Sequence, residues 1–170
     1  MPRRRLLAVA AAAALPALLL PGCGFQLRGA PELAFRTLFV NGSETSSLVN
    51  ELRRNLASIG QLQLVTTPAE RNTADAVLDM LTDQREKTVV GVNASGQVRE
   101  FQLRVRLRFR LRTPQGRELI PETELLQQRD ISFNESAVLA KEAEEGLMYR
   151  DMQSDIVQQL IRRLASVKTL

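Results

Sequence analysis

Five arginines occupy every second position near the middle of the chain, in the run FQLRVRLRFRLR between Phe101 and Arg112. Successive side chains of a β-strand point to opposite faces, so a strand would place the arginines on one face and the apolar residues on the other. A guanidinium group binds carboxylates and phosphates through paired, planar hydrogen bonds. The pattern therefore favours binding of an anion, by Arg104, Arg106, Arg108, Arg110 and Arg112.

The same arginines have candidate partners within the chain. The sequence from Thr113 to Arg117 is typical of a three-residue hairpin loop, with Gly116 in the left-handed position. If Thr113 pairs with Arg117, cross-strand ion pairs worth a fraction of a kcal/mol each are expected. They join Arg112 to Glu118, Arg108 to Glu122 and Arg106 to Glu124, and leave Arg110 opposite Ile120 and Arg104 opposite Leu126. Internal pairing and ligand binding both remain open.

Catalytic chemistry has little support in the sequence. The chain has no His and a single Cys, so the usual general base and a cysteine zinc site are both missing. No glycine-rich phosphate loop precedes a helix. Asp79 and Asp83 stand in no familiar acid–base spacing, and we interpret them as solvated charges. We therefore expect neither an enzyme nor a metal site.

The first 22 residues have the pattern of a secretory signal. Three arginines precede an apolar run that extends from Leu6 to Leu20 and contains Pro16. Such a run is short for a membrane span and typical of a signal peptide, which we place at residues 1–22. Without these arginines the net charge falls from +4 to +1, because 20 basic and 19 acidic residues remain. Basic character in the mature chain is therefore local.

The sole cysteine, Cys23, follows Leu20-Pro21-Gly22, which resembles a bacterial lipobox. We expect Cys23 to carry a diacylglyceryl group and an N-acyl chain, which together anchor a protein firmly to a membrane. The absence of Asp at position 24 favours the outer membrane, with the protein on its periplasmic side. Nucleic-acid binding is excluded by that compartment and disfavoured by an aromatic content of 4%.

The remaining chain reads as one domain, residues 23–170, that begins with a lipidated tether over residues 23–34. Alternating apolar residues predict strands at 35–40, 61–65, 74–92 and 101–112, and one more after the hairpin. Helical periodicity predicts one helix that starts at Ser46 or Ser47 and ends near Gly60, and a second over residues 136–167. We expect an α+β fold of order β-α-β-β-β-β-α, with two amphipathic helices on one face of a four- to five-stranded mixed sheet.

Two motifs carry a resemblance to a known family. CGFQLRG follows the signal at Cys23, and AVLAKEAEEGLMYRDMQSDIVQQLIRRL occupies the last helix. With the order of elements, they resemble the LptE family of lipopolysaccharide-assembly lipoproteins of Gram-negative outer membranes. The resemblance implies a non-enzymatic partner of the LptD β-barrel that plugs its lumen, assists its assembly and binds lipopolysaccharide during insertion into the outer leaflet.

The resemblance also implies where lipopolysaccharide binds. Lys141 matches a basic position of the family, whereas Ala94 stands at a second one, where Arg99, Lys87 or Arg85 could substitute. The arginine-rich strand would face the barrel lumen or an anionic ligand. The alternative is a periplasm-facing lipoprotein that scaffolds a different cell-envelope complex and does not bind lipopolysaccharide.

Overall fold

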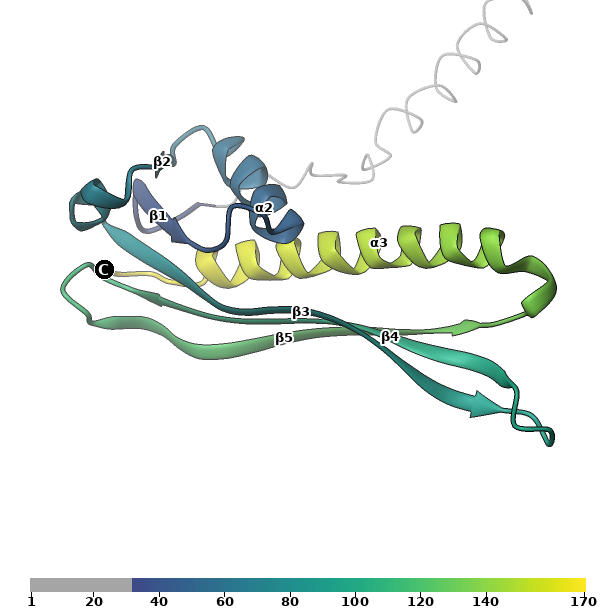
Figure 1. Ribbon diagram of the computed structural model, residues 1–170. Helices are drawn as coiled ribbons and strands as arrows, with labels where there is room; N and C mark the ends of the chain where they lie inside the picture. Colours follow the sequence, from purple (N-terminus) through teal and green to yellow (C-terminus); the bar gives the residue numbers. More distant parts are fainter. Residues whose placement is uncertain (1–31) are drawn as a thin grey trace, which may run out of the picture.

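The computed structural model describes residues 32–170, apart from the side chain of Glu135. Figure 1 shows a long, twisted sheet with helices along one side. The elements are β1 (Thr37–Asn41), α2 (Ser47–Ala57), β2 (Gln63–Val65), the 3₁₀ helix η2 (Pro68–Thr73), β3 (Ala76–Val92), β4 (Val98–Arg112), β5 (Glu118–Ser132), the 3₁₀ helix η3 (Glu135–Ala137) and α3 (Val138–Ala165). Their order confirms the predicted α+β fold.

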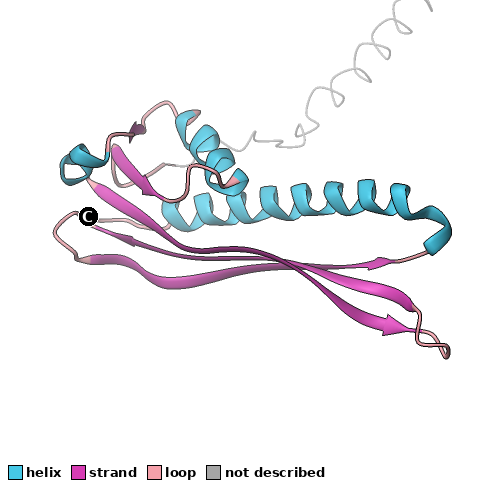
Figure 2. Cartoon of the chain, viewed as in Figure 1, coloured by secondary structure: helices cyan, strands magenta, loops and turns pink. Residues whose placement is uncertain are grey.

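The five strands form one mixed sheet in the order β2-β1-β3-β4-β5. β1 pairs in parallel with both β2 and β3, while β3, β4 and β5 pair antiparallel. β3, β4 and β5 are 15 to 17 residues long, and the tip of the β3–β4 hairpin diverges from the start of α3 (Figure 2). The sheet is thus a short parallel part joined to a long antiparallel ribbon.

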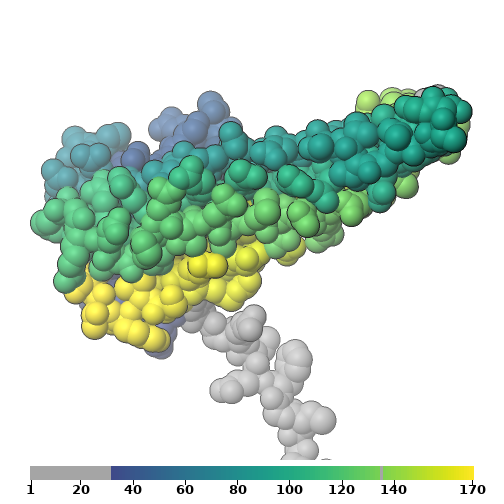
Figure 3. Space-filling view, turned by 90° about the horizontal axis from the view of Figure 1, so that it is seen from below, coloured from purple at the N-terminus to yellow at the C-terminus, as the bar shows by residue number. Residues whose placement is uncertain are grey.

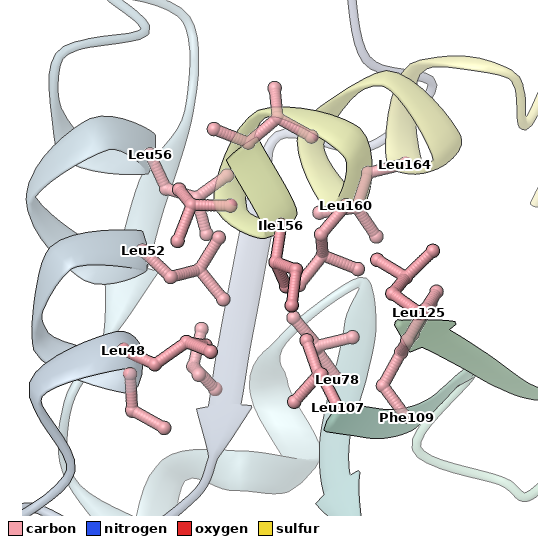
Figure 4. Packing of buried hydrophobic residues seen from close by; sticks show 14 of the residues in the cluster. Leu48, Leu52, Leu56, Leu78, Leu107, Phe109, Leu125, Ile156, Leu160 and Leu164 are labelled. Carbon is pink, nitrogen blue, oxygen red and sulfur yellow. The ribbon is translucent and has the colours of Figure 1, made fainter. Parts of the chain in front are cut away.

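The alternation in β4 has the predicted consequence. Every odd-numbered residue from Leu103 to Leu111 is buried beneath the helices, and the even-numbered arginines point to the other face. α2 and α3 cover the same side of the sheet and contribute leucine and isoleucine stripes to one core (Figure 4). The labelled core residues are Leu48, Leu52, Leu56, Leu78, Leu107, Phe109, Leu125, Ile156, Leu160 and Leu164.

The ends of the first helix were predicted with mixed success. Ser46 caps α2, because its Oγ accepts a hydrogen bond from the Val49 amide at 3.0 Å. The helix ends at Ala57, three residues before Gly60, and Ser58 caps it in a right-handed conformation. Among the described residues only Gly96 and Gly116 have positive φ, and both lie in hairpin loops. Gly116 is the position predicted from the loop sequence.

The predicted pairing of β4 with β5 was right at the loop and wrong beyond it. The Thr113 amide donates to the Arg117 carbonyl at 2.8 Å, and Arg112 lies opposite Glu118. Irregularities between Phe109 and Arg112 then shift the register by two residues. Arg108 consequently lies opposite Glu124, Arg106 opposite Leu126 and Arg104 opposite Gln128, and Leu111 rather than Arg110 faces Ile120. Pro121 lies on β5, an edge strand, as its missing amide donor requires.

Candidate functional site

A buried carboxylate on β3 holds the last two arginines of the β4 row, Arg110 and Arg112. Asp79 is 4% exposed, and its Oδ2 accepts hydrogen bonds from Arg110 Nε at 3.0 Å and Arg112 Nε at 2.8 Å. Its Oδ1 accepts from Asn41 Nδ2 at 2.8 Å. The interpretation of Asp79 as a solvated charge was therefore wrong. The long-range pairing of β3 with β4 places it between the two guanidinium groups.

Burial alone would raise the pKa of Asp79. The hydrogen bonds from Arg112, Asn41 and Arg110 outweigh it and lower the pKa from 3.8 to about 2. Asp79 is therefore charged at neutral pH and offsets part of the positive charge of the arginine row. Neither guanidinium faces water without a counter-ion.

The other three arginines also have partners on the same sheet face. Arg108 pairs with Glu122, and Arg106 Nε lies 3.9 Å from Glu124 Oε2. Arg104 Nε donates to Gln102 Oε1 at 2.7 Å. Glu122 and Glu124 are two of the three glutamates expected from the sequence, reached diagonally because of the register shift. The third expected ion pair does not form, because Arg112 lies opposite Glu118 but pairs with Asp79 instead. Four of the five arginines thus donate hydrogen bonds within the chain, whereas Arg106 Nε is buried without a hydrogen-bond partner among the described residues and only within ion-pair distance of Glu124.

This sheet face has no helix over β3, β4 and β5 in the described part of the chain. Figure 3 views the molecule from that side and shows the teal and green strands as an elongated, uncovered surface. Acidic and amide side chains of β3 and β5 flank the central arginines. The result is a long polar face in which charges of both signs alternate, which we call the open face.

The two candidate lysines converge on the opposite side of the sheet, near the start of α3. Lys87 of β3 and Lys141 of α3 line one pocket of about 240 Å³. Its apolar lining includes Phe101, Phe133 and Val138. Sequence reasoning had named the lysines but not these apolar residues, although Phe101 was assigned to the helix-covered face. We call this the distal pocket.

The distal pocket joins cationic groups to aromatic rings. Lys87 Nζ lies 4.3 Å from the centroid of the Phe101 ring, and that ring meets Phe133 edge-on at 5.4 Å. Lys87 also pairs with Glu145 at 2.6 Å, and Lys141 with Glu144 at 2.8 Å and Ser132 Oγ at 3.1 Å. Both ion pairs are partly exposed to solvent, and pairs of this kind contribute little to stability.

The other two candidates differ in position. Arg85 donates to Ser47 Oγ and to Gln153, and its guanidinium lies 5.5 Å from the Tyr149 ring, so it belongs to a polar network between α2, β3 and α3. Arg99 is exposed, and its backbone carbonyl accepts from the Phe133 amide at 2.8 Å beside the distal pocket. Ala94 lies in the β3–β4 loop, which Asn93 closes through the Ser95 and Gln97 amides.

Some expectations fall on other parts of the chain. The signal peptide, Cys23 and most of the tether lie outside the described residues. Within residues 32–170 no helix is both long and apolar enough to cross a membrane, and no cluster of His, Cys, Asp or Glu has the spacing of a metal site.

Curated relatives cover most of the chain. It is 25% identical over 155 residues to the LPS-assembly lipoprotein LptE of Pectobacterium atrosepticum, covering 90% of this chain and 82% of the relative. It is 28% identical over 158 residues to LptE of Photorhabdus laumondii, with the same two coverages.

Solved structures agree. The solution structure of lipoprotein B from Nitrosomonas europaea superimposes with a TM-score of 0.72 at 31% identity, covering 84% of this chain and 91% of that one. The rare lipoprotein B of Shewanella oneidensis, at 24% identity, shares the fold with a TM-score of 0.64 over 76% of this chain and 94% of its own.

The family model for LptE, described as lipopolysaccharide-assembly, matches residues 35–164. This range includes every strand and helix that forms the open face and the distal pocket. The chain therefore belongs to the lipopolysaccharide-assembly LptE family.

Proposed function

We propose that this protein is a non-enzymatic outer-membrane lipoprotein that binds lipopolysaccharide and assists its insertion into the outer leaflet. In this proposal it forms a complex with an LptD-like β-barrel, which it plugs and helps to assemble. A diacylglyceryl group and an N-acyl chain on Cys23 would hold it at the periplasmic side of the outer membrane.

The observation that carries the proposal is the convergence of Lys87 and Lys141 on the distal pocket. Lipopolysaccharide has phosphates next to acyl chains, so its receptor needs cations next to an apolar surface. The pocket offers both within one concavity, with Phe101 directly under the Lys87 ammonium. Val89, which pairs with Phe101 across β3 and β4, and Leu139, which follows Val138 in α3, are exposed apolar residues that could extend the contact with acyl chains.

The open face supports the plug role. A barrel lumen is polar and filled with water, so a domain inside it needs a polar surface. The arginine row has that character and is largely neutralised by Asp79, Glu122 and Glu124. Such a face can meet polar groups of a lumen without carrying a large net charge into it. We assign the arginines to the lumen contact and the distal pocket to lipopolysaccharide.

The test separates the two roles. Lys87→Gln combined with Lys141→Gln should weaken lipopolysaccharide binding at least about tenfold, because two charge-assisted contacts are lost. Lys168→Gln, beyond the C-terminal end of α3, is the matched control and should bind normally. Each variant is also tested for co-purification with the barrel, which should be unchanged.

Loss of barrel co-purification together with lipopolysaccharide binding would mean that the lysines act through the complex. Unchanged lipopolysaccharide binding in the double variant would remove the distal pocket from the proposal. In that case the alternative, a scaffold for another envelope complex that does not bind lipopolysaccharide, would be favoured.

A further inference from the structure

A second cavity lies at the other end of the sheet, where the parallel strands end. It has a volume of about 400 Å³ and is lined by residues of β1, β2, α2 and η2. This volume falls within the range of small-molecule sites. None of the candidate residues discussed above lines it, and it is separate from the distal pocket.

The topology explains why a crevice forms there. From the carboxyl end of β1 the chain enters α2 on one face of the sheet, and from the carboxyl end of β2 it enters η2. Phe39, Ala74 and Val77 pack together as a small cluster apart from the main core, with Val65 against it. The segments that follow β1 and β2 therefore leave the sheet in different directions. In open α/β sheets, ligands bind in the crevice that such a divergence opens at the carboxyl ends of the strands.

Two arginines line this cavity. Arg53 is half-buried, and its Nη2 donates to the carbonyls of Val40 at 3.1 Å and Gly42 at 3.5 Å. These bonds hold the guanidinium at the end of β1 and leave its other donors available. Arg71 reaches the cavity from η2 and is exposed.

Neither arginine has a carboxylate within 4.0 Å in the described part of the chain, in contrast to Arg108, Arg110 and Arg112 of β4. The rest of the lining is mostly apolar or neutral, from Phe39, Leu64, Val65, Thr66 and Pro68. One acidic residue, Glu44, also lines the cavity and opposes an anion. Arg53 and Arg71 therefore offer positive charge without an acidic partner, next to an apolar wall. This combination suits an anionic group that carries a small organic substituent.

We propose that this cavity is a binding site for a phosphate group, held by Arg53 and Arg71, with its organic substituent against Phe39 and Val65. A free phosphate ester and a phospholipid headgroup offer the same chemistry. The site is independent of the lipopolysaccharide role, because it shares no residue with the distal pocket.

Calorimetric titration of the full-length protein in a non-ionic detergent tests the site. The probes are inorganic phosphate and dihexanoyl phosphatidic acid. Binding of both would indicate a free phosphate ligand, and binding of the lipid analogue alone would indicate a headgroup; either supports the site. Arg71→Gln should weaken binding about tenfold, the loss of one charge-assisted hydrogen bond. Arg54→Gln, one residue from Arg53 and outside the cavity, should leave it unchanged.

Glu44→Gln supplies a change in the opposite direction. Removing the opposing charge should strengthen binding about two- to fivefold, a gain that a misfolded protein could not produce. The proposal is overturned if neither probe binds at millimolar concentration. It is also overturned if Arg71→Gln and Arg54→Gln weaken binding equally.

Discussion

The Asp79 carboxylate accepts a hydrogen bond from Arg112 Nε at 2.8 Å, and the same oxygen accepts one from Arg110. Asp79 also accepts from Asn41, so one buried side chain connects β1, β3 and β4. This contact lies where the short parallel part of the sheet meets the long ribbon. Asp79 is therefore the counter-ion of two of the five β4 arginines.

Asp79→Asn should destabilise the protein by about 2–3 kcal/mol, because it leaves two arginines without their counter-ion and replaces a charged acceptor by a neutral one. The free energy of unfolding from urea titration measures the effect. Asp151→Asn changes an exposed aspartate of α3 and serves as the control, expected to stay within about 0.5 kcal/mol of the parent. Equal stability of the two variants would show that the Asp79 contacts contribute no net stability.

The low pKa of Asp79 also predicts how stability depends on pH. Its folded-state pKa of about 2 lies below the unfolded value, so its stabilisation is present above about pH 4 and is lost as the pH falls toward 2. A shift of this size corresponds to about 2 kcal/mol. Unfolding free energies measured between these two pH values should fall less steeply for Asp79→Asn than for the parent. If the unfolding free energies of the two proteins fall equally steeply with pH, Asp79 is not the group responsible for the loss of stability.

Two leucines of α3 provide a matched test of the core. Leu160 is fully buried between α2 and the sheet, whereas Leu139 is 82% exposed near the start of the helix (Figure 4 shows Leu160). Leu160→Ala should cost about 2–5 kcal/mol through lost burial and a cavity, and Leu139→Ala should cost less than about 0.5 kcal/mol. Thermal and urea unfolding of both variants check this. Similar losses would mean that α3 does not pack as described.

The glutamates beside the lysines predict a gain of binding. Glu145 pairs with Lys87 at 2.6 Å and lines the distal pocket, so it competes with an anionic ligand. Glu145→Gln should therefore strengthen lipopolysaccharide binding about two- to fivefold, in keeping with a partly exposed ion pair worth at most about 1 kcal/mol. Asp151→Asn removes a negative charge from the same helix outside the pocket and should change binding little. If Glu145→Gln weakens lipopolysaccharide binding, Lys87 does not bind lipopolysaccharide in the way proposed.

Much of the fold was predictable because its signals are local. The alternation in β4 and the leucine spacing in α2 follow from the geometry of strands and helices alone. These two local patterns were enough to predict the order of the elements and the face of the sheet that the helices cover. The register of β5 was not predictable, because irregularities near Phe109 and Leu111 displace it by two residues. Pro121, which lies opposite them on β5, indicates an edge strand or a bulge but not the size of the shift.

The candidate site was predicted only in part. Lys141 and Lys87 are far apart in the sequence, and the fold brings them to one pocket. Arg85, which sequence reasoning placed with them, is engaged with Ser47 and Gln153 instead. Asp79 looked like any surface aspartate because its partners are more than 30 residues away. Contacts between distant segments depend on the sheet pairing, which no local pattern specifies.

The central claim is that this protein works in a complex with an outer-membrane β-barrel. Purification of the Cys23-anchored protein from native membranes, followed by mass spectrometry of the proteins that accompany it, tests this most directly. The account predicts a large β-barrel protein in stoichiometric amount. Recovery of the protein alone, or with soluble envelope proteins only, would contradict it.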